Sequence, residues 1–222
     1  MCGRFAFPGE DEILMTFGVR RVVIHPKSST NVAPTTVVPI VVEDAGQAGR
    51  EGSVLTRELR GARWGLIPSW AKELYTRPLI NARAETVTEK PSFRTAIRSR
   101  RAIVPATGYY EWVMENGVKV PYFLHPKDDN TILGFAGLYE WWRVPQGLTI
   151  AGTQDDWLCS MAILTRSASD DLGHIHDRMP VVVPSALVDD WLDPTLTDSH
   201  LVQDLIHAIP DPQLIAEPHS FS

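Results

Sequence analysis

The chain has few cysteines and no long apolar run, and each absence excludes a class of protein. Its only cysteines are Cys2 and Cys159, so we expect neither a disulfide framework nor a cysteine-based zinc site. No apolar run approaches the roughly 20 residues that span a bilayer, and no basic, apolar and small-residue series of a secretory signal opens the chain. We therefore expect a cytoplasmic, monomeric protein with no membrane segment, metal or cofactor.

The net charge of −6 argues against nucleic acid as a partner, but the charges are unevenly placed. Between Arg60 and Arg101 stand ten basic and three acidic residues, a local charge of +7 that leaves −13 for the rest of the chain. An ordinary solvated surface and a surface that faces phosphates account for this segment equally well.

The pattern of apolar residues predicts more strands than helices, without βα alternation. A hydrophobic share of 44% over 222 residues suits one domain spanning residues 1–222. Asn116-Gly117 predicts a two-residue hairpin, because both positions tolerate positive φ. Ser185 and Ser199 are the expected N-caps of two helices. Strands are predicted within 37–43, 54–68, 101–126, 131–142, 156–166 and 179–184, a hairpin loop at 44–53, and helices at 10–19, 89–99, 185–193 and 199–209. The class is therefore α+β, with a mostly antiparallel, barrel-like β core flanked by short helices.

The opening MCGRF places a cysteine directly after the initiator methionine. If Met1 is removed, Cys2 carries an α-amine and a thiol on adjacent carbons, two nucleophiles in one residue. An aldehyde that forms a Schiff base with the amine can then be attacked by the thiol, which closes a five-membered thiazolidine ring. Only an N-terminal cysteine can form this ring.

Two further stretches carry polar side chains where a strand favours apolar ones. Asn81, Arg83 and Glu85 alternate in PLINARAET, so an extended backbone points them to one face, although a polar ladder on a sheet explains them as well. Glu111 stands between Tyr110 and Trp112, where its carboxylate needs a partner or water. A salt bridge and a catalytic role are both open for Glu111.

A third polar stretch is GHIHDRMP, in which His174 and His176 precede Asp177 and Arg178. A single histidine is more often a structural hydrogen-bond donor than a catalyst, so this stretch alone decides nothing. Cys159, within LCSMAIL, is expected to be a buried apolar thiol.

Seven blocks together resemble the SOS-response-associated peptidase (SRAP) family in their usual order. The blocks are MCGRF, NVAP (31–34), RWGLIPSW (63–70), INARAET (80–86), GYYEW (108–112), AILT (162–165) and IHDRMP (175–180). The resemblance implies the SRAP fold and a protein that captures abasic sites in single-stranded DNA through a covalent link to Cys2. It also implies self-processing removal of Met1, lyase-like chemistry, a role in the DNA damage response, and association with the nucleoid when damaged DNA is bound.

The resemblance assigns a role to four catalytic residues. Cys2 is the crosslinking residue. Asn81 orients Cys2 or binds the opened sugar, Glu111 shuttles protons at the amine, and His176 protonates the departing or re-forming sugar hydroxyl.

The resemblance also implies a set of DNA contacts. Arg4, Arg83 and Arg178 are expected to hold the phosphates that flank the lesion, and Thr165 adds a smaller polar contact. Trp70 offers a ring on which a neighbouring base can stack.

Two other functions remain open from the residues alone. Glutamine amidotransferases of the N-terminal-nucleophile type also begin with a cysteine after Met1, and in these amidohydrolases the thiol attacks an amide. A non-covalent binder of single-stranded or modified DNA, in which Cys2 plays no part, is the third possibility. An adduct that survives denaturation separates the covalent function from both.

Overall fold

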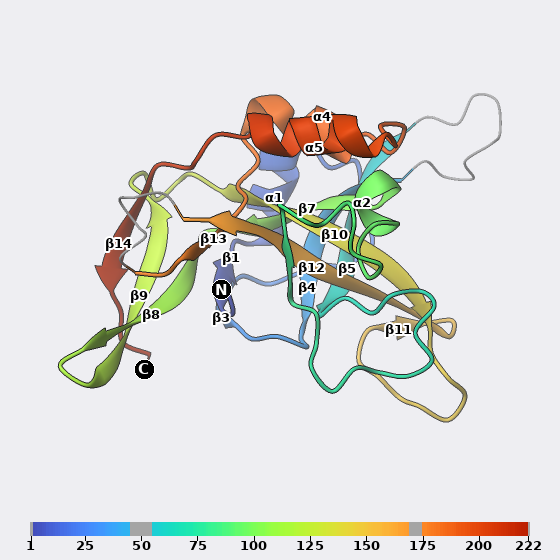
Figure 1. Ribbon diagram of the computed structural model, residues 1–222, viewed down its shortest axis with the longest axis horizontal. Helices are drawn as coiled ribbons and strands as arrows, with labels where there is room; N and C mark the ends of the chain where they lie inside the picture. The colour runs from blue at the N-terminus through green and yellow to red at the C-terminus, as the bar shows by residue number, and fades with distance from the viewer. Residues whose placement is uncertain (1, 45–54, 169–174, 222) are drawn as a thin grey trace.

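The computed structural model describes residues 2–44, 55–168 and 175–221 (Figure 1). Met1, His174 and most of the predicted 44–53 loop lie outside these residues. The N-terminal half contains β1 (Phe5–Phe7), α1 (Glu10–Phe17), β2 (Arg21–Val22), β3 (Ser29–Val32), β4 (Val37–Asp44), β5 (Thr56–Trp64), β6 (Asn81–Arg83), α2 (Ala96–Ser99) and β7 (Arg101–Ala106). The C-terminal half contains β8 (Gly108–Glu115), β9 (Val118–Pro126), β10 (Leu133–Arg143), β11 (Thr153–Gln154), β12 (Trp157–Ser167), β13 (Arg178–Pro180), the 3-10 turn η1 (Ser185–Leu187), α4 (Val188–Leu192), α5 (Ser199–Ala208) and β14 (Leu214–Pro218).

The strands form two sheets, and the larger sheet closes on itself. Its order is β11-β12-β10-β7-β4-β5-β2, and β12 pairs with β5 as well as with β10. Strands β12, β10, β7, β4 and β5 therefore make a closed barrel, which confirms the predicted α+β class with a barrel-like, mostly antiparallel core. The parallel pairs are β12–β5, β12–β6 and β2–β5.

The smaller sheet has the order β14-β9-β8-β1-β3 and projects from the barrel (Figure 1). Its β8–β9 hairpin turns at Asn116 and Gly117, whose φ values are 49° and 83°. This confirms the predicted turn, since glycine and asparagine tolerate positive φ best. The sheet places β8 beside β1, which begins three positions after Cys2.

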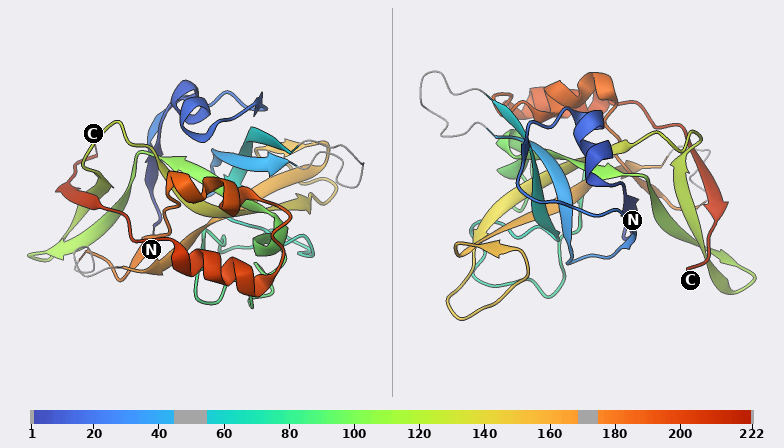
Figure 2. Two further views of the ribbon diagram at one scale, coloured as in Figure 1. Left: turned by 90° about the horizontal axis from the view of Figure 1, so that it is seen from above. Right: turned by 180° about the vertical axis from the view of Figure 1, so that it is seen from behind.

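Apolar side chains fill the barrel on one side and pack under the helices on the other. Ile40 lies in the barrel cluster with Trp64 and Phe135, whereas its neighbour Val41 lies in the helix-side cluster with Trp191. Both faces of β4 are thus buried, which explains why the strand reads as a continuous apolar run. Figure 2 shows α4 and α5 together over one side of the molecule.

Three of the local helix predictions are wrong. Residues 89–99 are mostly turns with a helix only at Ala96–Ser99, because Pro91 lacks an amide hydrogen and disfavours helix at the residue before it. Ser185 opens a 3-10 turn and caps nothing. Asp198, not Ser199, caps α5, and its carboxylate accepts hydrogen bonds from the amides of His200 and Leu201.

Arg101, the first residue of β7, is 3% exposed and hydrogen-bonds the segments of α2 and α4 to the barrel. Burial lowers its pKa to about 10, so it remains charged at neutral pH. The guanidinium donates hydrogen bonds to the carbonyl oxygens of Ile97, Arg98, Trp191, Asp193 and Leu196. Four of these carbonyls lie at the ends of α2 and α4, where backbone partners become scarce, and that of Leu196 lies in the turn after α4.

Candidate active site around Cys2

Cys2 lies three positions before the first residue of β1, the strand of the smaller sheet that starts near the N-terminus (Figure 1). Its exposed fraction is 0%, and it packs in the barrel cluster with Phe5 and Trp64. The pKa of its thiol is raised far above the ordinary value, first by burial and then by the nearby Glu111 carboxylate. The thiol is therefore neutral at physiological pH, and a reaction that begins at the sulfur is disfavoured.

Asn81 is the predicted site residue with a direct hydrogen bond to Cys2. Its Nδ2 atom donates to the Cys2 carbonyl oxygen at 3.0 Å. Strand β6 holds Asn81 in place by pairing in parallel with β12, where Asn81 lies opposite Ile163. The Oδ1 atom of Asn81 is buried and accepts no hydrogen bond from the described residues. Such an atom is costly to bury, which is a sign that it serves a donor supplied by another state or a ligand.

Glu111 and Tyr109 share one face of β8 and approach Cys2 from the smaller sheet. Glu111 is 4% exposed and Tyr109 is 1% exposed. The pKa of Tyr109 is raised first by burial and then by electrostatic interaction with Cys2 and Glu111, so its hydroxyl stays protonated. Tyr109 was not assigned a role from the sequence, although its spacing of two from Glu111 on a strand places both on one face.

His176 lines the same narrow cleft as Tyr109, Glu111 and Arg178. Its Nδ1 atom accepts a hydrogen bond from the amide of Arg178 at 3.0 Å and lies 2.7 Å from Oδ1 of Asp177. The amide suits a neutral imidazole, and the Asp177 carboxylate suits a protonated one. Asp177 thus contacts His176, its neighbour in the chain, although the sequence suggested no role for it.

Arg178 is held by an ion pair. Its Nη1 and Nη2 atoms donate to the two carboxylate oxygens of Glu85 at 2.6 and 2.9 Å. Nη2 also donates to the carbonyl oxygen of Thr165 and lies 3.3 Å from the Thr165 Oγ1 atom. The bonds to Arg178 are the leading cause of a lowered pKa at Glu85. These hydrogen bonds connect β13 to the segment after β6. Because both Nη atoms of Arg178 already donate to Glu85, a phosphate that binds Arg178 must share the guanidinium with this carboxylate.

The other predicted DNA contacts lie further out. Arg4 donates from Nη1 to Oδ1 of Asn31 at 2.8 Å, and Arg83 is exposed. Trp70 is 60% exposed on the loop between β5 and β6. Its neighbour Ala71 accepts a hydrogen bond from Nε1 of Trp142, which attaches this loop to the end of the barrel. The structure therefore groups Cys2, Asn81, Glu111 and His176, encloses Thr165, and leaves Trp70 on the surface.

Searches for metal-ligand clusters and for membrane segments found none in the described ranges. No group of three or more His, Cys, Asp or Glu residues there is arranged to hold a metal ion. None of the helices in those ranges is long and apolar enough to cross a membrane.

A family model and several known proteins match most of the chain. The family described as SOS response associated peptidase (SRAP) matches residues 1–220. The abasic site processing protein YoqW of Bacillus subtilis is 38% identical over 213 residues, which cover 93% of this chain and 86% of that protein. The abasic site processing protein HMCES of Gallus gallus is 28% identical over 190 residues, which cover 75% of this chain and 54% of that protein.

Solved structures agree with the sequence comparisons. A crystal structure of a Bordetella bronchiseptica protein aligns with a TM-score of 0.78 and 23% identity, covering 99% of this chain and 100% of that one. A Bacteroides thetaiotaomicron protein aligns with a TM-score of 0.76 and 25% identity, covering 98% of this chain and 91% of that one. The match over residues 1–220 and the relatives of 38% identity make this chain a member of the SOS response associated peptidase (SRAP) family.

Proposed function

We propose that this protein captures abasic sites in single-stranded DNA by forming a thiazolidine between Cys2 and the opened sugar, after Met1 has been removed. The observation that carries the proposal is the hydrogen bond from Asn81 to the Cys2 carbonyl, beside a cleft lined by Glu111 and His176. Relatives at 38% identity named as abasic site processing proteins support the same substrate.

The order of the steps follows from the neutral thiol. Because burial and Glu111 raise the pKa of the Cys2 sulfur, the α-amine reacts first, attacking the C1′ aldehyde of the ring-opened deoxyribose. One water leaves as the Schiff base forms. His176 supplies the proton to the departing oxygen, and it protonates the sugar hydroxyl when the reaction reverses.

Ring closure is the second step. The sulfur bonds to C1′ as the C=N double bond becomes a single bond, and Glu111 passes the sulfur proton on to the nitrogen. Fixing both nucleophiles on one residue gives effective molarities that reach roughly 10⁵ M in favourable geometries. The Oδ1 atom of Asn81 is buried without a donor among the described residues. It accepts a hydrogen bond from the α-amine and so orients that amine.

Removal of Met1 belongs to the same proposal. Hydrolysis of the Met1–Cys2 peptide bond consumes one water and liberates the α-amine, without which no Schiff base forms. The family description contains the word peptidase, and Glu111 lies close enough to shift the Cys2 pKa. We assign this carboxylate the role of activating the water.

The DNA strand is held by charge and stacking. Arg4 and Arg83 contact flanking phosphates, Arg178 joins them while still paired to Glu85, and Thr165 positions Arg178. Trp70, with 60% of its surface exposed, stacks on a neighbouring base. The protein acts as a monomer on damaged DNA in the cytoplasm.

The test is a denaturing gel with an oligonucleotide that contains one abasic site. Protein whose intact mass proves the loss of Met1 is expected to give a heat-stable band, with a mass one water below the sum of the two partners. Cys2→Ala should abolish the band, and the control Cys159→Ala should retain it. A band of equal strength from Cys2→Ala refutes the proposal. No band from processed wild-type protein returns the choice to a non-covalent binder or an amidohydrolase.

A further inference from the structure

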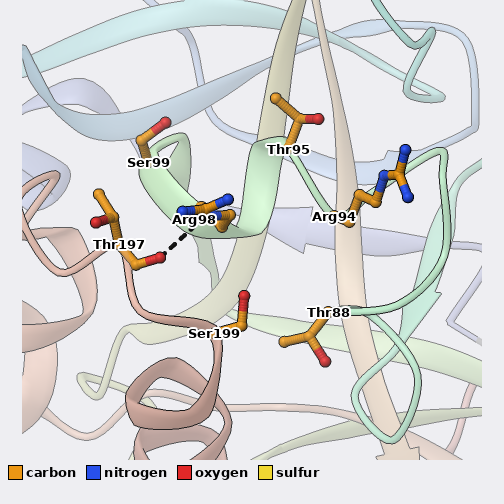
Figure 3. A pocket seen from close by; sticks show the side chains of 7 residues that line it. All are labelled: Thr88, Arg94, Thr95, Arg98, Ser99, Thr197 and Ser199. Carbon is orange, nitrogen blue, oxygen red and sulfur yellow. Dashed lines mark hydrogen bonds between the residues drawn. The ribbon is translucent and has the colours of Figure 1, made fainter.

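A second, polar pocket lies between α2 and the beginning of α5 (Figure 3) and shares no lining residue with the cleft of Glu111 and His176. Its volume is about 440 Å³, and seven residues line it: Thr88, Arg94, Thr95, Arg98, Ser99, Thr197 and Ser199. All seven are arginine, serine or threonine, so the lining offers two guanidinium groups and five hydroxyls. It contains no carboxylate and no aromatic ring.

The two arginines bring positive charge that no carboxylate of the described residues neutralises by direct contact. In the parts of the chain that the structure describes, neither Arg94 nor Arg98 forms an ion pair, whereas Arg57 and Arg178 are each paired with carboxylates. The Nε atom of Arg98 donates to the carbonyl oxygen of Thr197 at 3.0 Å, which fixes the guanidinium at the pocket wall. Figure 3 shows Arg98 between Thr197 and the open centre, with Ser199 facing the same space.

Asp198, which stands in the sequence between the lining residues Thr197 and Ser199, already has hydrogen-bond partners. Asp198 accepts hydrogen bonds from the amides of His200 and Leu201 at 2.8 and 3.1 Å, and these bonds are the main causes of its lowered pKa. Arg98 lowers that pKa further by its charge, but Asp198 does not line the pocket. A ligand would therefore contact arginine and hydroxyl groups and leave the α5 amides to Asp198.

This set of donors matches a phosphate group. Phosphate presents several acceptor oxygens, which a guanidinium fork and neighbouring hydroxyls satisfy together. The lining has no aromatic ring on which a base could stack. Arg94, Thr95, Arg98 and Thr197 are all exposed, so the pocket suits a backbone phosphate that passes across the surface better than an enclosed nucleotide.

The pocket is joined to the Cys2 site by one short segment. Asn81, which contacts Cys2, begins this segment, and Thr88 ends it in the pocket wall. Gln203 of α5 donates to the Ala84 carbonyl oxygen at 3.2 Å and lies 3.5 Å from Oγ1 of Thr88, which holds the segment against α5. Seven residue steps span at most roughly 25 Å.

We propose that this pocket binds a phosphate of the same DNA strand whose abasic sugar reacts at Cys2, a proposal that rests on the function proposed above. With roughly 3.4 Å per nucleotide in a stacked strand, a span of at most about 25 Å places this phosphate within about seven nucleotides of the lesion. Arg94 and Arg98 lie in the basic stretch between Arg60 and Arg101. The pocket accounts for part of that local charge beyond the immediate site.

The experiment compares crosslinking to two oligonucleotides, one of about 20 nucleotides with a central abasic site and one of about three. The variant is Arg94→Gln/Arg98→Gln, and its control is Arg20→Gln/Arg143→Gln, which removes the same charge from α1's C-terminal side and β10. The half-saturating protein concentration and the maximal rate are measured over a range of salt concentrations.

For the long oligonucleotide, loss of one phosphate contact should lower the salt slope by about 0.7. Between about 1 M and 0.1 M salt that slope amounts to a factor of about five, so the variant should need about fivefold more protein at 0.1 M. The maximal rate and the short oligonucleotide should be unaffected, as should the control variant. Arg94→Gln alone, which keeps the Arg98–Thr197 bond, should show a smaller shift in the same direction.

Three results would overturn the proposal. An unchanged slope for the long oligonucleotide removes the pocket from DNA binding. An equal loss for both lengths means that the variant disturbs the Cys2 site itself. Binding of inorganic phosphate is followed by NMR through the backbone amide shifts of Ser99 and Ser199. If the variant loses this binding while its DNA capture is unchanged, the pocket is assigned to free phosphate. Failure of wild-type protein to crosslink either oligonucleotide bears on the proposed function alone, because binding of undamaged long strands still tests the pocket.

Discussion

Substitution of Asn81 by alanine is expected to slow adduct formation without unfolding the protein. The change removes the 3.0 Å hydrogen bond to the Cys2 carbonyl and the buried Oδ1 acceptor that we assign to the α-amine. Two hydrogen bonds at about 0.5–1.5 kcal/mol each amount to about 1–3 kcal/mol of lost orientation. If this loss appears in the transition state, the crosslinking rate falls by about 5- to 150-fold.

The assay is single-turnover crosslinking at saturating protein, so that DNA affinity does not enter the rate. Asn130→Ala is the matched control, because Asn130 is exposed and its side chain contacts only Asp128 among the described residues. A rate within about twofold of wild type, with the fold intact by circular dichroism, would refute the argument that Asn81 orients Cys2. In that case its hydrogen bond to Cys2 is a structural contact only.

Three further predictions concern stability. Arg101→Met removes five buried hydrogen bonds to carbonyl oxygens and should cost about 3–5 kcal/mol, a fall of ~6–20 °C in Tm by calorimetry; a fall under about 3 °C contradicts it. Gly108→Ala should destabilise β8, since its Cβ would lie 2.5 Å from Cζ of Phe123 and 2.6 Å from the Leu124 carbonyl oxygen; an unchanged urea midpoint argues against this close packing. Burial raises the pKa of Cys159 from 9.0 to about 12. Between these two pH values the folded state keeps a proton that the unfolded state loses. The free energy of unfolding should therefore fall above pH 9 by up to about 1.4 kcal/mol per pH unit. Urea titrations of Cys159→Ala should show a shallower fall, and an equal fall excludes this thiol as a cause.

Local patterns predicted the elements whose structure is fixed by neighbouring residues. The Asn116-Gly117 turn and the helix at Glu10–Phe17 depend on backbone preference and a short apolar period, which the sequence displays directly. Residues 89–99 have an apolar period that suits a helix, but the proline and the docking of Arg101 confine the helix to one turn. Closure of the barrel by β12 and β5 joins residues about a hundred positions apart and leaves no local pattern.

The candidate site divides in the same way. The resemblance selected Asn81, Glu111 and His176, and the structure lays each beside Cys2 or its cleft. It did not reveal that Glu85 holds Arg178, because that pair joins residues 93 positions apart. Nor could it reveal the pocket between α2 and α5, since Arg98 and Thr197 meet only when the chain folds. Charge counting located the basic stretch but not its geometry.

The position of Cys2 has a mechanical consequence. Only Gly3 and Arg4 separate this residue from β1, and β1 is hydrogen-bonded along both edges, to β3 and to β8. The amides of Thr107 and Tyr110 add bonds to the carbonyls of Ala6 and Arg4. Tension applied at the N-terminus along the axis of β1 therefore loads these bonds in parallel and must shear the strand from two neighbours at once. A force on a DNA strand attached at Cys2 would therefore be opposed by the hydrogen bonds of β1 to both neighbouring strands when it acts along that axis.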